Sequence, residues 1–449
     1  MLKIYPSSAL SGDVIVPGDK SVTHRALLIG AIAHGTTEIH DPGLGEDNRA
    51  TMSVLQALGV DATHDSPRHF TVRGHGPESW KAPSAPLDCM NSGTTARLLS
   101  GLLAGLGISA ELTGDASLRS RPMKRIADPL VDIGFDVRVG ADGRMPIRVA
   151  GTPSAREDES VRAVLRIASA QVKSCILLSR LFASAVTEVA EPAVSRDHTE
   201  RLLRAFGVRC ESSPHYRSPV SSAVEDTVPL VRLHPATRLE GRVLHIPGDT
   251  SSSAFWVAAG LVTGGAVRVC NVGVNPTRSS YLDVLQRMGA NVRLSNRRLL
   301  SSGEPVADLT TSTGDLQGTV VAGPEIPILI DEIPILAVVA ARCHGRFEVR
   351  DASELRVKES DRIAMMVSLL RELGLQVDEY PDGFGFEGSA GKPLSAGRFQ
   401  AAGDHRIAMS AVVAGLACDG TSELDDPACI AVSYPSFLEE ITRLGGRVS

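Results

Sequence analysis

The 449-residue sequence lacks long apolar runs, a leader-like N-terminus and any excess of basic charge. Without an uncharged apolar run of about 18 residues, no membrane-spanning helix is expected. Met1–Pro6 runs straight into folded-looking sequence and has no secretory cleavage site, so we expect a cytoplasmic protein. The net charge of −6 argues against a broad basic face, and we expect no nucleic-acid partner.

Cysteine is scarce and shows no pairing pattern. The seven cysteines are an odd number, lie far apart, have mostly apolar neighbours and form no Cys-x-x-Cys pair. They are Cys89, Cys175, Cys210, Cys270, Cys343, Cys418 and Cys429. We interpret them as small buried hydrophobic residues, and expect neither a bound metal ion nor a cofactor.

A short pattern occurs six times along the chain: a helical run that ends in Leu/Ile-x-x-apolar-Gly, followed by alternating residues. The closing glycines are Gly59, Gly134, Gly207, Gly289, Gly374 and Gly445. Each copy is typical of an amphipathic helix that a left-handed glycine ends, followed by a strand. Chance matching of a common helix ending is the alternative, but the spacing of 71 to 85 residues is too even to favour it.

A longer repeat indicates duplication. Val16–Ser21 reads VPGDKS, and Ile246–Ser251 reads IPGDTS, each before an alanine-rich apolar stretch. The length already favours two domains. We therefore predict one discontinuous domain of residues 1–17 plus 248–449 and an inserted domain of residues 18–247, with crossovers near 17–20 and 246–249.

Only the first copy of this repeat carries basic residues, namely Lys20, His24 and Arg25. A glycine-containing turn that enters a helix presents unpaired backbone N–H groups, and Lys20 and Ser21 would strengthen such a site for an anion. The alternative is an ordinary capped helix start, as the second copy suggests.

Further segments place basic or amide side chains at expected helix starts or turns. They are Asn91–Arg97, Arg119–Met123, Ser169–Lys173, Arg196–Glu200 and Asn275–Arg278. The first four suit phosphate, carboxylate or sugar hydroxyl groups. Taken singly, Asn91–Arg97 and Arg119–Met123 are more typical of a helix cap or a solvated charge than of a site. Asp197 and Glu200 also suit a plain charge complement at a helix N-terminus, and Asn275–Arg278 is more typical of a structural turn.

The densest charge lies late in the chain. Lys358 and Arg362 are spaced i,i+4 and would share one helix face, with Glu359 beside them; a solvated charged face is the alternative. Arg406 follows Gly403-Asp404-His405 at an expected helix start. Asp331 lies in the apolar stretch Ile328–Leu336, where an unpartnered carboxylate would be costly to bury.

Together these segments resemble the family of 5-enolpyruvylshikimate-3-phosphate synthases from near the first residue to the last. The resemblance implies an α/β fold of two similar domains, each of three βαβαββ units in an inside-out barrel, with an active site in the inter-domain cleft. It also implies transfer of the enolpyruvyl group of phosphoenolpyruvate to the 5-hydroxyl of shikimate 3-phosphate, with release of phosphate. These two small molecules are the expected partners, and we expect a monomer.

Site roles follow from the resemblance, residue by residue. Catalytic roles fall to Asp331, Glu359 and Lys20. Shikimate 3-phosphate would contact Lys20, Ser21, Arg25, Ser169, Ala170, Gln171, Arg196, Asp331 and Lys358. Phosphoenolpyruvate would contact Lys20, Gly93, Arg121, Gln171, Arg362 and Arg406, and its carboxylate and phosphate suit the guanidinium fork.

Two alternatives and one departure accompany this resemblance. The related enolpyruvyl transferases acting on UDP-N-acetylglucosamine use a loop cysteine, but Asp115–Arg121 contains none. A non-catalytic sugar-phosphate-binding protein is the other alternative, against which Asp331 and Glu359 argue. The motifs look like the second, often glyphosate-tolerant class, but Gly93 stands where tolerant members typically carry alanine, so we expect partial tolerance.

Overall fold

The computed structural model describes residues 1–449 apart from 8, 153, 155, 157, 218–226 and 313, and the chain divides into two compact units. Unit 1 consists of Met1–Pro17, Pro247–Leu299 and Pro305–Ser449, and unit 2 of Gly18–Ile246 and Leu300–Glu304. In the part of the chain that the structure describes, no helix has the length and apolarity needed to cross a membrane.

The segment Leu300–Glu304 belongs to unit 2, whereas the sequence placed it with residues 248–449. Its side chains explain the difference. Ser302 Oγ donates to the His245 carbonyl at 2.7 Å, and the Glu304 carboxylate lies 2.9 Å from His198 Nδ1. Glu304 is 1% exposed, so this short loop is an integral part of unit 2.

Each unit has three four-stranded sheets within the described residues, all of one pattern: a parallel strand pair followed by two antiparallel neighbours. In unit 2 the strands, in sheet order, are β14 (Val243–His245), β3 (His34–His40), β5 (His69–His75), β4 (Asp61–Ser66); β6 (Leu87–Asp88), β7 (Ser109–Thr113), β9 (Ile147–Ala150), β8 (Val137–Arg138); β10 (Val161–Val164), β11 (Thr187–Ala190), β13 (Thr227–Leu233), β12 (Cys210–Arg217). The helices of unit 2 are α1 (Lys20–Ala31), α2 (Glu46–Ala57), η1 (Pro77–Ser79), α3 (Gly93–Gly105), α4 (Ala116–Ser120), α5 (Lys124–Asp132), α6 (Ala170–Ser179) and α7 (His198–Ala205).

Unit 1 repeats the same plan. Its strands, in sheet order, are β16 (Asn291–Leu299), β17 (Pro305–Ser312), β15 (Val267–Gly273), β2 (Gly12–Ile15); β18 (Val320–Val321), β19 (Arg346–Val349), β21 (Gly383–Glu387), β20 (Val377–Tyr380); β22 (Arg398–Phe399), β23 (Ser422–Leu424), β1 (Leu2–Tyr5), β24 (Arg447–Val448). The helices are α8 (Thr250–Thr263), α9 (Ser280–Arg287), η2 (Gly323–Glu325), α10 (Ile326–Leu329), α11 (Ile333–Ala340), η3 (Ser353–Val357), α12 (Arg362–Glu372), α13 (His405–Leu416), η4 (Ala428–Val432) and α14 (Phe437–Arg443).

The two crossovers exchange strands between otherwise regular repeats. Strand β2 leads into α1 but pairs with β15 in unit 1, while β14 leads into α8 but pairs with β3 in unit 2. The expected βαβαββ units are therefore present. Among the described residues the strands form six separate four-stranded sheets and no closed barrel.

The six glycines of the short repeat end their helices as predicted. Their φ angles are +89° at Gly59, +97° at Gly134, +86° at Gly207, +80° at Gly289, +86° at Gly374 and +96° at Gly445. Side chains rarely adopt this left-handed conformation, so glycine is the residue that allows each chain reversal.

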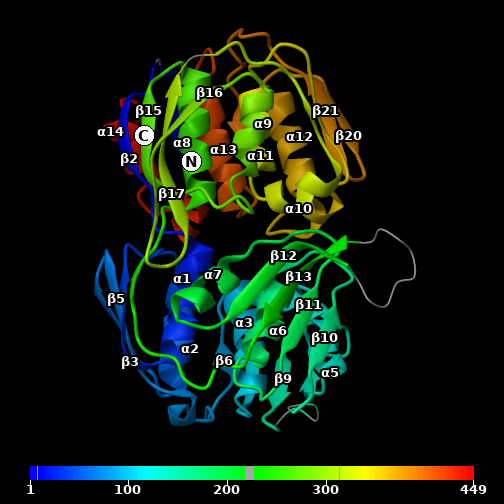
Figure 1. Ribbon diagram of the computed structural model, residues 1–449. Coiled ribbons are helices and arrows are strands. Elements are labelled where there is room, and N and C mark those ends of the chain that lie inside the picture. The colour runs from blue at the N-terminus through cyan, green and yellow to red at the C-terminus, as the bar shows by residue number, and fades with distance from the viewer. Residues whose placement is uncertain (8, 153, 155, 157, 218–226, 313) are drawn as a thin grey trace. The chain divides into compact units, whose positions relative to one another are not determined.

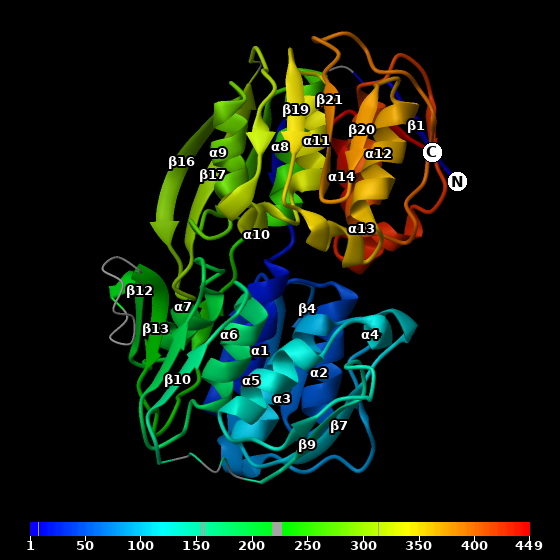
Figure 2. The ribbon, with the colours of Figure 1, turned by 90° about the vertical axis from the view of Figure 1, so that its right-hand side faces the viewer.

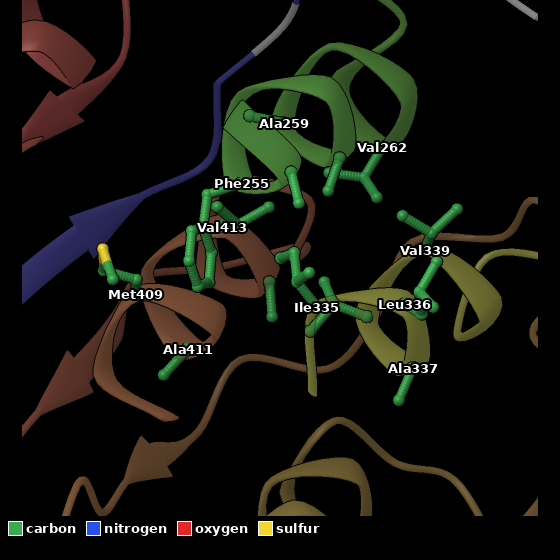
Figure 3. Close-up of a cluster of buried hydrophobic side chains, with 14 of the residues drawn as sticks. Phe255, Ala259, Val262, Ile335, Leu336, Ala337, Val339, Met409, Ala411 and Val413 are labelled. Atoms are coloured by element: carbon green, nitrogen blue, oxygen red, sulfur yellow. The ribbon is translucent and has the colours of Figure 1, made fainter. Parts of the chain in front are cut away.

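The core of each unit is built on helices that lie among its strands (Figures 1 and 2). In unit 1, Figure 3 shows Phe255 of α8, Leu336 of α11 and Val413 of α13 in one cluster, each at most 1% exposed. These helices are apolar on nearly all faces, which is typical of a helix with no solvent side. Six of the seven cysteines are buried as predicted, and Cys270 is half-buried.

In unit 2 the close approach of α3 and α6 requires glycine. A methyl group at Gly101 would lie 2.2 Å from the Cys175 carbonyl oxygen, and one at Gly105 would lie 2.2 Å from that of Ser179. Both distances are far below a van der Waals contact, so only glycine permits this packing. The pair of helices thereby fixes the positions of their N-terminal residues, where predicted site residues lie.

Candidate active site

The N-terminus of α1 is capped by a side chain of its own segment. The Asp19 carboxylate caps the helix and accepts from the Val22 N–H at 2.9 Å, so one of the free donors is already satisfied. Lys20 Nζ lies 3.0 Å from the Asp47 carboxylate, and its side chain is 29% exposed. The cap and the Lys20–Asp47 ion pair together fix the start of α1 against α2.

His24 does not contribute a charge to this group. The residue is fully buried, its Nδ1 lies 2.7 Å from Thr51 Oγ1, and burial lowers its pKa to about 3. Thr51 Oγ1 in turn lies 2.7 Å from Thr95 Oγ1, which donates to Ser92 Oγ. His24 thus anchors α1 through α2 to the start of α3.

Arg25 is buried, with 3% exposure, and each of its three guanidinium nitrogens donates a hydrogen bond within unit 2. Nε donates to Thr199 Oγ1 at 2.6 Å, Nη1 to the Ser21 carbonyl at 2.9 Å and Nη2 to Ser174 Oγ at 2.9 Å. Burial lowers the pKa of Arg25 to about 10, which leaves it charged at neutral pH. The three bonds join the start of α1 to α6 and α7.

The starts of α3 and α6 meet through Gln171. Its Oε1 accepts from Arg97 Nη1 at 2.6 Å, and its Nε2 donates to Thr94 Oγ1 at 3.1 Å. Ser169 caps α6, with Ala170 as the first helical residue. A methyl group at Gly93 would lie 3.1 Å from Arg97 Nη1, so the backbone of this turn faces a guanidinium directly.

Arg121 and Arg196 occupy the remaining predicted positions of unit 2. Arg121 follows α4, is half-buried and donates from Nη2 to Asn91 Oδ1; its Nη1 would lie 3.5 Å from a methyl group at Gly93. Arg196 is half-buried before α7, close enough to Arg25 for their like charges to interact. Two groups of basic side chains therefore surround the helix starts.

A buried ion-pair cluster joins α6 to α7. Lys173 Nζ lies 2.8 Å from the Glu191 carboxylate and 2.9 Å from that of Glu200, and all three side chains are at most 2% exposed. Burial alone lowers the pKa of Lys173, but the two carboxylates outweigh it and the net shift is upward. Lys173 is therefore charged and locks the two helices together.

In unit 1 Arg362 gathers three carboxylates. Its Nε donates to Asp404 Oδ2 at 2.8 Å, its Nη2 to Glu359 Oε2 at 2.6 Å, and its Nη1 lies 3.4 Å from Asp331 Oδ1. Arg362 is 1% exposed and Asp404 fully buried. Burial opposes the charge of Arg362, but Glu359 and Asp404 more than compensate and raise its pKa.

Asp331 is surrounded by guanidinium groups. Arg406 Nη1 donates to the Asp331 carbonyl at 2.9 Å, and its Nη2 lies 3.9 Å from the carboxylate. Arg278 Nη1 lies 4.0 Å from the same carboxylate and 3.7 Å from that of Glu332, which is fully buried. The acid in the apolar stretch therefore has the partners that its burial required.

The prediction that Lys358 and Arg362 share one helix face is wrong. It does not share a helix with Arg362, because η3 ends at Val357 and α12 begins at Arg362 behind its cap Asp361. Lys358 is half-buried, and burial lowers its pKa although the nearby Asp331 charge opposes the shift.

The structure thus brings Asp331, Glu359, Arg362 and Arg406 into one group within unit 1. In unit 2 it links the starts of α1, α3, α6 and α7, which carry or adjoin the predicted residues of that unit. Reasoning from sequence missed Arg97, Arg278 and Asp404 as members of these groups. All three lie inside motifs with visible basic or capping residues, but only their burial and partners distinguish them from surface charges.

Comparison with known proteins gives matches over the whole chain. Residues 4–441 match the family described as EPSP synthase (3-phosphoshikimate 1-carboxyvinyltransferase). A 3-phosphoshikimate 1-carboxyvinyltransferase of a Synechococcus species is 44% identical over 447 residues, which cover 99% of this chain and 96% of that protein. The Gloeobacter violaceus protein of the same description is 45% identical, with 98% of each chain covered.

Solved structures agree. An EPSP synthase from Acinetobacter baumannii superposes with a TM-score of 0.86 at 37% identity, covering 100% of this chain and 99% of that one. The enolpyruvyl transferase NikO from Streptomyces tendae gives 0.78 at 19% identity, covering 100% and 98%, which shows a shared fold.

Proposed function

The chain belongs to the EPSP synthase (3-phosphoshikimate 1-carboxyvinyltransferase) family, and on this premise we propose which of its residues carry the reaction. It is an enzyme that transfers the enolpyruvyl group of phosphoenolpyruvate to the 5-hydroxyl of shikimate 3-phosphate and releases phosphate. The observation that carries the assignment is the group in unit 1 in which Arg362 holds Glu359 and approaches Asp331.

The reaction needs proton transfer at two positions. In the addition, the 5-hydroxyl oxygen bonds to C2 of phosphoenolpyruvate, loses its proton, and the methylene carbon gains one as the double bond breaks. In the elimination, the methyl group loses a proton, the double bond re-forms, and phosphate leaves with the C2–O electron pair. Each positioned acid or base contributes about 10²-fold to 10⁴-fold to the rate.

Asp331 and Glu359 are the residues that we assign to these transfers. Asp331 would accept the hydroxyl proton, and Glu359 would give and take the proton at the methylene carbon. Arg362 supports both assignments, because its guanidinium contacts the two carboxylates and is itself fixed by buried Asp404. Lys20 would assist from unit 2 as a further proton donor.

Phosphoenolpyruvate carries a carboxylate and a phosphate, which need several cationic contacts. We assign these to Arg362 and Arg406 of unit 1 and to Lys20 and Arg121 of unit 2, with Gln171 and the Gly93 backbone as hydrogen-bonding groups. Guanidinium groups bind both anions through paired hydrogen bonds. They would also stabilise the charge of the tetrahedral intermediate and of the departing phosphate.

Shikimate 3-phosphate would be held mainly by residues at helix starts of unit 2. They are Lys20, Ser21, Arg25, Ser169, Ala170, Gln171 and Arg196, with Asp331 and Lys358 acting from unit 1. The closeness of Arg25 to Arg196 supports this assignment, because a phosphate between like charges would offset their repulsion. Groups of both units would then act on one pair of substrates.

A matched pair of variants tests the shikimate 3-phosphate assignment. Arg196→Gln removes a half-buried charge before α7, whereas Arg204→Gln removes an exposed charge at the end of the same helix. By titration calorimetry, Arg196→Gln should bind shikimate 3-phosphate at least about tenfold more weakly, as expected for a lost charge-assisted hydrogen bond. Equal affinity in the two variants would show that Arg196 does not contact this ligand.

The reaction is tested by product analysis. Incubation with both substrates should give one new compound with the mass of shikimate 3-phosphate plus the enolpyruvyl group. Binding of both ligands without any such product would favour the non-catalytic alternative.

A cytoplasmic monomer remains our prediction, and light scattering at working concentration tests the oligomeric state.

A further inference from the structure

Three histidines lie in register across the outer face of one sheet in unit 2. Strand β3 pairs with β5 so that His40 is opposite His69, and with β14 so that His245 is opposite His40. The alternate residues Ile39, Phe70 and Leu244 are at most 1% exposed and form the inner face. The histidines therefore point away from the core of unit 2.

Glu38 completes a compact set of possible metal ligands on this face. Its side chain lies on the same side of β3 as His40, because the two residues are two apart in a strand. Glu38 Oε2 is 3.5 Å from His40 Nε2 and 4.0 Å from His69 Nε2. One ligand atom of each of the three residues lies within 4.8 Å of the others.

The ring of His69 is oriented by a carboxylate behind it. His69 Nδ1 lies 3.2 Å from Asp65 Oδ2, and that oxygen also accepts from Thr71 Oγ1 at 2.5 Å. A proton on Nδ1 that is directed to Asp65 leaves the Nε2 lone pair free to bind a cation.

His69 Nε2 faces Glu38 without a hydrogen bond of its own. Among the described residues it is a shielded side-chain nitrogen that has no hydrogen-bond partner, and 4.0 Å is too long for one with Glu38. The His40 ring is held between its neighbours, at 4.7 Å from the His69 centroid and 4.9 Å from that of His245. Two imidazoles and a carboxylate thus converge on one point.

We propose that Glu38, His40 and His69 bind a divalent transition-metal ion such as Zn²⁺. Two histidines and one carboxylate are a ligand set that zinc accepts, with the fourth position left to water. Metal-binding histidines generally donate the N–H of their other ring nitrogen to a carboxylate or carbonyl oxygen, and Asp65 lies where it would accept from His69 Nδ1. The ion would join β3 to β5 and stabilise this sheet of unit 2.

A surface ion-pair cluster is the competing explanation. Such a cluster needs no bound ion, whereas the proposed site binds one zinc ion and loses it when either histidine is removed. The nearby Arg68 is paired with Asp41 at 2.6 Å and adds little net repulsion.

The experiment uses the full chain without an affinity tag, stripped with a chelator and titrated with zinc chloride by calorimetry near neutral pH. Cobalt(II) absorption reports the geometry of the same site. The variants are His40→Ala, His69→Ala and Asp65→Asn, and the control is His64→Ala. His64 lies on β4 of the same sheet, where its ring packs edge-on against Phe70.

The wild-type chain and His64→Ala should each bind one zinc ion. His40→Ala and His69→Ala should bind at least about 100-fold more weakly, and Asp65→Asn about 10-fold to 100-fold more weakly. Circular dichroism and retained enolpyruvyl transfer show that each variant is folded, with His40→Gln as the substitute if His40→Ala is not. No wild-type binding up to about 100 µM zinc, or binding unchanged in both histidine variants, would overturn the proposal.

Discussion

The contact between Arg362 and Asp404 allows the stability of unit 1 to be tested separately from the reaction. Nε and Oδ2 are 2.8 Å apart, with the two side chains 1% and 0% exposed. Removing one partner of such a pair leaves a buried charge and costs about 3–5 kcal/mol. Arg362→Met should therefore lower the free energy of unfolding by about that amount and abolish turnover.

A second variant shows whether the stranded charge causes the loss. Asp404 caps α13 by accepting from the Arg406 N–H at 2.9 Å, and an asparagine oxygen retains this bond. Arg362→Met/Asp404→Asn should regain about 2 kcal/mol or more, because no buried charge is left unpaired, but it should remain inactive. Regained stability without regained turnover would separate the two roles of Arg362.

Urea unfolding followed by circular dichroism measures these differences, and phosphate release measures turnover. Arg371→Met is the matched control, because Arg371 is an exposed arginine on the same helix α12. The reasoning is refuted if Arg362→Met costs less than about 1 kcal/mol, or if the double variant is no more stable than the single one.

Three further predictions concern pH, proton transfer and inhibitor binding. Burial raises the pKa of the Asp404 carboxyl, but Arg362 outweighs burial and the net shift is downward. The stability that this shift contributes is therefore present above about pH 3.9, the ordinary pKa of aspartate, and is lost as the pH falls further. Unfolding by acid should accordingly be less steep in Asp404→Asn. Glu359→Gln should lower kcat by about 10²-fold to 10⁴-fold with little change in KM, and unchanged kcat, as expected of the exposed control Glu354→Gln, would contradict its role. In Gly93→Ala the added methyl group would lie 3.1 Å from Arg97 Nη1 and 3.5 Å from Nη1 of Arg121, which we assign to phosphoenolpyruvate. Inhibition by glyphosate, measured in competition with phosphoenolpyruvate, should therefore weaken because the methyl group takes space from the inhibitor. Unchanged inhibition would contradict this steric account.

The repeats were predictable from sequence because their cause is local. A helix commonly ends at a glycine with positive φ, and this preference depends on the local sequence alone. Gly59 and its five counterparts were therefore predictable from the sequence. The exchange of β2 and β14 between units could not be read in this way. Strand pairing across more than 200 residues depends on tertiary packing, and short strands carry little pattern of their own.

The candidate site was predictable by residue type but not by arrangement. Lys358 and Arg362 have helical spacing, yet the cap at Asp361 starts a new helix between them. His24 looked like part of a basic cluster, but burial leaves it neutral. In the sequence Asp404 was only a neighbour of Arg406 at an expected helix start, and the structure shows it both as the cap of α13 and as the buried partner of Arg362.

Phosphate release from phosphoenolpyruvate, measured with shikimate 3-phosphate present and then omitted, tests the central claim most directly. The account predicts sustained release when both substrates are present and none when shikimate 3-phosphate is left out, because the leaving phosphate departs only after the 5-hydroxyl has added to C2. No release with both substrates, or equal release without shikimate 3-phosphate, would contradict it.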